Sequence, residues 1–511
     1  MSNTTENSKR IAKNTLFLYV RMLLIMVVTL YTSRVVLNVL GVEDFGIYNV
    51  VGGLVSMFAF FSSSLSNATQ RFLNFELGKG NLEKVQNVFN LSVLIYLIIS
   101  SVVFIFAEVV GLWLIYNKLV IPPERLEAAL WIFHATLISL FFTLNGIVFN
   151  SVLIARENMK AYAYIGLIEA FLRLLIALAL SYFAYDKLKL YAILLLCVTI
   201  CIQGCYAIIC IKKYPECRYR FFWQSGLFKE MFKFAGWNVF GTAIWSINEQ
   251  GTNIMLNIFF GPVINAAKGV ASQVNSAVNN FSMNFFTAVR PQIVKSYASG
   301  DIDYFIKLIY NSSRYSFYLM LLITLPILFR SDYILYLWLK QIPDFAPAFV
   351  RWILIYSLIN VLTNPFWFAI QAVGKLKKYC LIGGLVYLTA FPISYIFLSL
   401  GYSPVSVFII LAAVRAVYLF VTIKITNNYV NFSMAEYIYS VLIPIAKVTI
   451  VSVLIIGLIN LFLPQNFFAL VVICLFCFII TPLTIYSIGV TGQERLYIKN
   501  KITELLKWRK K

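Results

Sequence analysis

Long apolar runs alternate with short polar segments along almost the whole chain. The runs at residues 16–31, 91–114 and 467–480 exceed or approach the roughly 18–20 residues that a helix needs to span a bilayer. We count fourteen such runs, with centres near residues 26, 57, 99, 140, 173, 202, 247, 278, 319, 359, 390, 412, 452 and 474. The pattern therefore predicts an all-α integral membrane protein with about fourteen transmembrane helices.

A weak internal repeat has an offset of about 220 residues and is carried by three pairs: Gly41 and Gly261, Arg71 and Arg290, and Gly80 and Gly300. Because each copy holds six helices, an even number, both copies have the same orientation. We expect two six-helix lobes, at residues 1–211 and 234–430, related by a parallel pseudo-twofold axis along the membrane normal. A cytoplasmic linker at 212–233 joins them. Helices 13 and 14 follow at 431–492, and 493–511 is expected to form a basic amphipathic cytoplasmic tail, with disorder as the alternative.

Charged residues make up only 12% of the chain, about half the share found in soluble proteins, which excludes a water-exposed globular enzyme. The sequence has 42 Lys and Arg residues against 21 Asp and Glu residues. With the N-terminus in the cytoplasm, 28 basic residues fall on the cytoplasmic side and nine on the other, in agreement with the positive-inside rule. The excess of positive charge therefore indicates a topology with both termini in the cytoplasm, and nucleic acid is not an expected partner.

Polar stripes distinguish three of the expected spans. They consist of Asn49, Gly53, Ser56, Ser63, Asn67 and Gln70 in span 2, Asn238, Thr242, Ser246, Glu249 and Asn253 in span 7, and Lys268, Ser272, Asn275, Asn279 and Ser282 in span 8. Because polar groups facing lipid are costly, we expect these faces to line a hydrated cleft between the lobes. The alternative is that the same residues hold helices together by hydrogen bonds.

Charged residues inside the spans have separate interpretations. Glu249 is an unpaired carboxylate deep in its helix, so we expect an H⁺ or Na⁺ site there, with a salt bridge to a cavity arginine as the equal alternative. Arg21 either faces the cavity or extends to the inner surface. Glu169 and Arg173 are four residues apart and predict a structural ion pair. Arg415, near the middle of span 12, has no local acidic partner.

Catalytic and metal-binding motifs find little support. The sequence has no G-x-x-x-x-G-K-[ST] phosphate loop. His134 is the only histidine and is expected to be a satisfied interior residue, while Glu108 is expected to reach the membrane interface. Cys197, Cys201 and Cys205 share a helix face without a nearby histidine or carboxylate, which favours packing over metal binding. We therefore expect no enzymatic activity, no metal and no cofactor other than H⁺ or Na⁺ as a coupling ion.

Two short motifs resemble those of a known family. One is the run Tyr31-Thr-Ser-Arg34-Val-Val-Leu-Asn-Val-Leu-Gly41-Val-Glu-Asp-Phe-Gly46-Ile-Tyr48, and the other is Val289-Arg290-Pro291-Gln292 followed by Gly300-Asp301. Both are similar to motifs of Wzx-type polysaccharide flippases in the multidrug/oligosaccharidyl-lipid/polysaccharide exporter (MOP) superfamily. The resemblance implies that an undecaprenyl-diphosphate-linked oligosaccharide is moved from the inner to the outer leaflet of a bacterial inner membrane by alternating access. The product would be a surface polysaccharide such as the O-antigen of lipopolysaccharide. By position, the resemblance also suggests that Arg21, Arg34 and Arg290 meet the diphosphate.

The expected substrate-binding residues combine cations for the diphosphate, polar side chains for sugar hydroxyls and tryptophans for stacking on sugar faces. They are Arg21, Arg34, Asn67, Arg71, Trp237, Asn238, Trp245, Lys268, Asn275, Asn279 and Arg290. The expected partners are a lipid-linked oligosaccharide and the membrane, with a polysaccharide polymerase or chain-length regulator as a further candidate. The alternatives are a multidrug extruder of the same superfamily, whose cavity should be rich in carboxylates, and a membrane-embedded glycan polymerase or transferase.

Overall fold

The computed structural model describes residues 2–156, 158–183, 185–298, 300–496 and 499–500, and within helices it leaves some side chains undescribed. The described residues are almost entirely helical and contain no strand. The helices are α1 (Ser2–Ser56), α2 (Phe60–Gly78), α3 (Leu82–Asn117), α4 (Leu126–Ala155), α5 (Met159–Ala179), α6 (Lys187–Lys213), α7 (Ser225–Phe260), α8 (Pro262–Ala298), α9 (Ile302–Leu339), α10 (Ala346–Val361), α11 (Asn364–Val373), α12 (Leu376–Lys378), α13 (Gly384–Leu388), α14 (Ala390–Ser399), α15 (Val405–Val430), α16 (Met434–Tyr437), α17 (Ile443–Leu461) and α18 (Phe467–Thr484). Short 3₁₀ segments lie at Met57–Ala59, Pro123–Arg125, Leu180–Tyr182 and Pro215–Cys217, and π-helical turns at Tyr379–Gly383, Ile438–Leu442 and Ile485–Gly489.

Eleven helical segments of the described chain are long and apolar enough to cross a membrane. The prediction of an all-α, multi-pass membrane protein is thereby confirmed. Helices α2, α7 and α8 are not among the eleven, and these helices carry most residues of the polar stripes. The expected total of fourteen spans stays a prediction, as do the lobe, linker and tail boundaries drawn at residues 211, 233, 430 and 492.

The glycine pairs of the sequence repeat have matching backbone conformations. Gly41 has φ 83° and ψ 170° and separates two helices within α1, and Gly261 has φ 78° and ψ −175° between α7 and α8. Gly80 and Gly300 have φ values of 70° and 75° in the turns that follow α2 and α8. Residues with a side chain rarely adopt such positive φ values, which explains why glycine occupies these four positions. The paired glycines of the two repeat copies therefore share a positive-φ backbone conformation.

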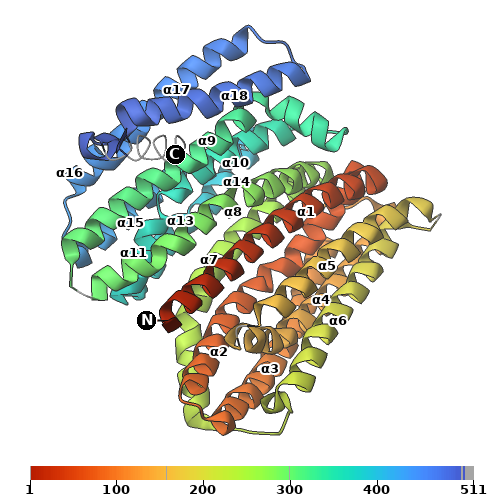
Figure 1. Ribbon diagram of the computed structural model, residues 1–511. Helices are drawn as coiled ribbons and strands as arrows, with labels where there is room; N and C mark the ends of the chain where they lie inside the picture. Colours follow the sequence, from red (N-terminus) through yellow and green to blue (C-terminus); the bar gives the residue numbers. More distant parts are fainter. Residues whose placement is uncertain (1, 157, 184, 299, 497–498, 501–511) are drawn as a thin grey trace. The chain divides into compact units, whose positions relative to one another are not determined.

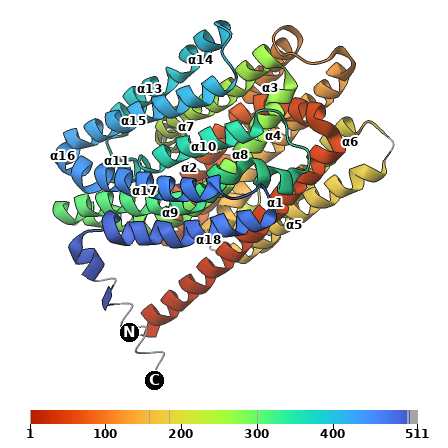
Figure 2. The same ribbon diagram turned by 90° about the horizontal axis from the view of Figure 1, so that it is seen from above.

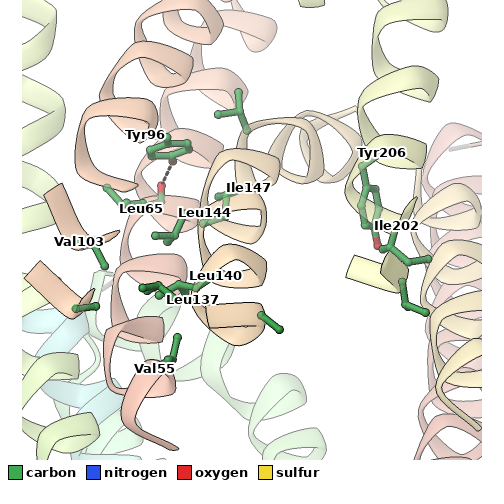
Figure 3. Packing of buried hydrophobic residues seen from close by; sticks show 14 of the residues in the cluster. Val55, Leu65, Tyr96, Val103, Leu137, Leu140, Leu144, Ile147, Ile202 and Tyr206 are labelled. Carbon is green, nitrogen blue, oxygen red and sulfur yellow. Dashed lines mark hydrogen bonds between the residues drawn. The ribbon is translucent and has the colours of Figure 1, made fainter. Parts of the chain in front are cut away.

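The chain divides into two compact units. Unit 1 runs up to Gly269 and includes Leu398–Leu400. Within it α4 packs against α1, α2, α3 and α6, and α1 packs against α5 (Figure 1). Apolar side chains fill the space between these helices, and the buried Tyr96 hydroxyl donates a hydrogen bond of 2.7 Å to the carbonyl oxygen of Leu65 (Figure 3). The core of unit 1 is thus an apolar helix-bundle core in which the buried Tyr96 hydroxyl is satisfied.

Unit 2 comprises Val270–Phe397 and the chain from Gly401 onwards. Here α10 packs against α9 and α15, while α17 and α18 lie together along α9 (Figure 2). Arg330 of α9 is 1% exposed and donates Nη1 to the carbonyl of Pro464 at 2.9 Å and Nη2 to that of Leu463 at 3.2 Å. A single buried arginine therefore fixes the turn between α17 and α18 to α9.

The motif around Gly41 and Gly46 forms a structural junction in unit 1. Arg125, just before α4, pairs with Asp44 of α1 at 2.5 Å and with Asp186, ahead of α6, at 3.1 Å. A methyl group added at Gly46 would lie 1.9 Å from the carbonyl oxygen of Pro262, the first residue of α8. The absence of a side chain at Gly46 thus permits the close approach of α1 to α8, while Arg125 joins three helix ends.

Candidate functional site

A dense polar interface joins α1, α7 and the first two turns of α8 inside unit 1. Asn253 Nδ2 donates to the carbonyl of Asn49 at 3.0 Å, and Ser246 Oγ donates to that of Met57 at 2.9 Å. A Cβ at Gly53 would lie 2.7 Å from the side-chain amide nitrogen of Asn253, so the two helices are in close contact. Ser246 and Asn253 were expected to face a hydrated cleft, but each is 6% exposed and bonds the backbone of α1 or of the 3₁₀ segment that follows it. The helix-joining alternative describes them correctly.

Three asparagines complete this interface. Asn265 of α8 donates Nδ2 to the carbonyl and side-chain oxygens of Asn253 at 2.7 and 2.8 Å. Asn257 Nδ2 donates to Asn265 Oδ1 at 2.9 Å, and Asn257 Oδ1 accepts the backbone N–H of Val120 at 2.8 Å. Asn257 and Asn265 are fully buried. Satisfied buried amides of this kind hold helices in one fixed arrangement, which makes the junction a rigid element.

Glu249 and Lys268 form an ion pair at the edge of this interface. Lys268 is 5% exposed, and its Nζ lies 2.7 Å from the carbonyl oxygen of Glu249 and 3.7 Å from Glu249 Oε1. The Glu249 side chain is 32% exposed. Glu249 is therefore not the unpaired carboxylate that the sequence suggested, and its partner is a lysine rather than an arginine. The positive charge of Lys268 is therefore paired with the Glu249 carboxylate in the described structure.

A second polar group lies on the α8 face within unit 2. Asn279 Nδ2 donates to Asn275 Oδ1 at 2.8 Å and to Ser357 Oγ of α10 at 3.4 Å, and Ser357 also bonds Asn275. Ser357 is fully buried, whereas Asn275 and Asn279 are partly exposed. These amides can therefore both join helices and present hydrogen-bonding groups to a ligand.

Arg290 extends from the later part of α8 and is exposed. Its Nη2 donates to Gln371 Oε1 of α11 at 3.2 Å, and its guanidinium lies 5.4 Å from the centre of the Phe368 ring. No acidic side chain of the described chain pairs with Arg290. A cation held by an amide and an aromatic ring keeps most of its donors available for an anion.

The remaining predicted site residues are Arg34 and six residues whose side chains are not described. Arg34 lies in α1, is partly exposed and makes no hydrogen bond or ion pair with the described residues. Six expected substrate contacts have side chains outside the described part of the structure: Arg21, Asn67, Arg71, Trp237, Asn238 and Trp245. The structure brings together Asn275 and Asn279, and separately Lys268 and Glu249.

Two further side-chain contacts involve acidic residues of the spans. Arg173 Nη2 lies 2.8 Å from Glu169 Oε1, which confirms the predicted pair on α5. His134 Nδ1 lies 3.3 Å from Glu108 Oε1, so Glu108 has a partner on α4. The His134 side chain is 46% exposed, so the prediction that it is an interior residue is wrong. The second pair joins α3 and α4, and no local spacing in the sequence could have revealed it. Among the described residues, no cluster of His, Cys, Asp and Glu could hold a metal ion.

Sequence reasoning also missed the surroundings of Arg415 in unit 2. Its Nη2 donates to Asn360 Oδ1 and, at 3.0 Å, to Thr363 Oγ1. The guanidinium lies 4.4 Å from the ring centre of Tyr418 and 5.5 Å from that of Tyr387. The absence of a nearby acid was visible in the sequence, but the partners come from different helices and have no shared motif.

Comparison with known proteins gives one family and several similar folds. The family described as polysaccharide biosynthesis protein matches residues 11–297. No curated protein matches the chain in sequence. The lipid II flippase MurJ, in an inward closed conformation, is 15% identical with a TM-score of 0.67, over 92% of this chain and 97% of that protein.

Two transporters of the MOP superfamily have similar folds. An inward-facing multidrug resistance MATE transporter is 14% identical with a TM-score of 0.64, over 81% of this chain and 98% of its own. A transporter from Pyrococcus furiosus Vc1, described as having a binding pocket of reversed polarity, is 15% identical with a TM-score of 0.60, over 82% and 96% of the two chains. These similarities establish a transporter fold.

Proposed function

The chain belongs to the polysaccharide biosynthesis protein family, and from this membership we propose that it is a flippase for lipid-linked oligosaccharide. The substrate is an undecaprenyl-diphosphate-linked oligosaccharide, and alternating access moves it from the inner to the outer leaflet for surface polysaccharide synthesis of the O-antigen type. The transporter fold, with eleven apolar helices, supports transport over enzymatic activity.

One observation carries the choice of an anionic substrate. Two carboxylates within described helices have a cationic partner, Glu169 with Arg173 and Glu249 with Lys268, while Glu108 contacts His134. By contrast, no acidic partner in the described chain is found for Arg34, Arg290, Arg330 or Arg415. Of these, Arg330 is bonded to two backbone carbonyls. An unbalanced positive interior favours an anion and disfavours an extruder of organic cations.

The physical chemistry of the substrate agrees with this charge balance. Moving a diphosphate through hydrocarbon without compensating cations is prohibitively costly, and arginine binds phosphate oxygens in bidentate fashion. Sugar hydroxyls need donors and acceptors, which Asn275 and Asn279 offer at their partly exposed positions. We assign the diphosphate to Arg21, Arg34, Arg71 and Arg290, and the sugars to the amides and to Trp237, Asn238, Trp245 and Asn67.

The remaining features of the proposal follow from charge and topology. The basic asymmetry of the sequence favours cytoplasmic termini in a bacterial inner membrane. Glu249 and its partner Lys268 are the proposed place at which H⁺ or Na⁺ acts, because ion binding to Glu249 would release the lysine. A polysaccharide polymerase or chain-length regulator is the proposed protein partner.

Reconstituted vesicles test the assignment of the arginines. Arg290→Ala should lower the rate of flipping of a fluorescent lipid-linked oligosaccharide at least about tenfold, because a charge-assisted contact to the diphosphate is lost. Arg351→Ala is the matched control and should leave flipping unchanged, because among the described residues Arg351 bonds Ser331 and Asp332 and no other polar side chain. Equal rates for wild type and Arg290→Ala would remove Arg290 from the site. Chain growth or hydrolysis of the lipid by the purified protein would instead favour the polymerase or transferase.

A further inference from the structure

Arg415 carries a positive charge at a place where the bilayer makes charge costly. It lies eleven residues into α15, which is one of the segments apolar enough to span a membrane. Its described surroundings contain hydroxyl, amide and aromatic groups but no carboxylate. An intramembrane arginine without an acid partner indicates a function that uses the charge.

The hydrogen bonds of Arg415 are incomplete. A guanidinium has five N–H donors, and the two on Nη2 are used by Asn360 Oδ1 and Thr363 Oγ1. The remaining donors, on Nε and Nη1, have no acceptor among the described residues, and Nε is buried. Arg415 as a whole residue is nevertheless partly exposed.

Three tyrosine rings surround the guanidinium. Their centres lie 4.4 Å (Tyr418), 5.5 Å (Tyr387) and 5.8 Å (Tyr356) from its central carbon. Ring faces stabilise a cation without neutralising it, which keeps Arg415 charged. The hydroxyls of Tyr356 and Tyr387 lie 3.0 Å apart, so one donates to the other near the guanidinium. Together these groups form a cluster rich in hydrogen-bond donors around the guanidinium, and none of them is acidic.

Helix α10 connects this place with the polar face of α8. Tyr356 and Asn360 contact Arg415, while the intervening Ser357 bonds Asn275. The three α10 residues lie within about one helical turn of one another, so the two polar groups of unit 2 share a helix segment.

We infer that Arg415, Asn360, Thr363 and Tyr356 form a binding site for a phosphate-type oxyanion. The anion accepts hydrogen bonds from Nε and Nη1 of Arg415, and its negative charge neutralises the guanidinium. If the protein is the proposed flippase, the diphosphate of the lipid-linked substrate is one source of this chemistry, and free phosphate or pyrophosphate is the other.

Thermal unfolding of the purified full-length protein tests the site without requiring transport. Sodium pyrophosphate should raise the melting temperature in a saturable manner, beyond the effect of sodium chloride at equal ionic strength. Arg415→Gln should weaken the apparent affinity at least about tenfold, since the charged donor is lost. Arg351→Gln removes the same charge from an ion pair elsewhere in unit 2 and should bind pyrophosphate like the wild type. Lack of stabilisation of the wild type, or equal affinity in Arg415→Gln, would overturn the inference.

A second variant keeps the test valid if Arg415→Gln does not fold. Asn360→Asp places a carboxylate against the guanidinium, so the fold keeps its contact while the site acquires an internal anion. This variant should melt at or above the wild-type temperature and lose the response to pyrophosphate. An unchanged response in Asn360→Asp would overturn the proposed site.

The source of the anion is determined by a polyprenyl diphosphate without sugar, tested beside inorganic phosphate and pyrophosphate. Stabilisation by the lipid that disappears in Arg415→Gln assigns the site to the substrate, whereas stabilisation by the free anions alone assigns it to a soluble ligand. Both results retain the oxyanion site. Anion binding by a protein that does not flip lipid would contradict only the proposed function, and flipping without Arg415-dependent binding would contradict only the site.

Discussion

The ion pair between Glu249 and Lys268 gives a prediction whose size can be worked out from its geometry. At the 3.7 Å separation of Nζ and Oε1, Coulomb's law gives about 4.5 kcal/mol for an effective dielectric constant of 20 and about 1 kcal/mol in water. Because the Glu249 side chain is 32% exposed while Lys268 is buried, we take an intermediate value of about 2 kcal/mol. Glu249→Gln should therefore lower the free energy of unfolding by about that amount, since it leaves a buried ammonium with only a carbonyl acceptor.

A double-mutant cycle isolates the energy of the pair. Lys268→Met should be less damaging because it also removes the buried charge, and adding Glu249→Gln to Lys268→Met should cost almost nothing further. The coupling energy from equilibrium unfolding in mixed detergent micelles should then be about 2 kcal/mol. Glu43→Gln, which neutralises an exposed carboxylate of the same unit, serves as the control and should be additive with Lys268→Met. A coupling energy below about 0.5 kcal/mol, the usual limit of additivity, would refute the pair as a stabilising contact.

Other predictions concern a buried arginine, a carboxylate at a helix end and the energetics of transport. Arg330→Met should lower the free energy of unfolding by about 1–3 kcal/mol, because two charge-assisted hydrogen bonds to the carbonyls of Leu463 and Pro464 are lost. The variant should also expose the α17–α18 turn to protease. An unchanged melting temperature and an unchanged rate of cleavage would contradict this role of Arg330. Burial alone would raise the pKa of Asp186, but hydrogen bonds from the backbone N–H of Lys189 and from Arg125 outweigh it and hold the pKa below its usual range. The wild-type protein should therefore be more stable than Asp186→Asn at neutral pH, and this difference should disappear as the pH falls through the folded-state pKa of Asp186. A difference in melting temperature that does not change with pH would contradict this prediction. Moving two negative charges outward is favoured by roughly 5 kcal/mol per 100 mV of inside-negative potential. A potassium-diffusion potential of that sign should therefore speed flipping. A flipping rate that does not depend on the sign of the potential would indicate ion-compensated exchange.

The sequence predicted the helical architecture because membrane spans need long apolar runs and their turns need special residues. Gly41 and Gly261 were recognisable as equivalent turns, and both adopt the positive φ that only glycine readily accepts. The pairing of Glu169 with Arg173 was predictable because both lie on one helix face.

Contacts between distant helices were not predictable in the same way. Glu249 and Lys268 are 19 residues apart on different helices, so the sequence presented the carboxylate as unpaired. Polar stripes indicate a face that avoids lipid, but they do not distinguish a cleft from a tight interface. Asn253 illustrates this limit, since its amide joins α1, α7 and α8 and is almost fully buried. The tyrosines around Arg415 likewise become neighbours only through the packing of several helices.

The most direct measurement compares two substrates in one preparation. Proteoliposomes holding the wild-type protein are loaded either with a fluorescent lipid-linked diphosphate oligosaccharide or with a fluorescent organic cation, and movement across the bilayer is followed by a membrane-impermeant quencher. The excess of unpaired arginines predicts rapid flipping of the anionic glycolipid and no transport of the cation above that of protein-free vesicles. Transport of the cation with the glycolipid left in its original leaflet would contradict the proposed function.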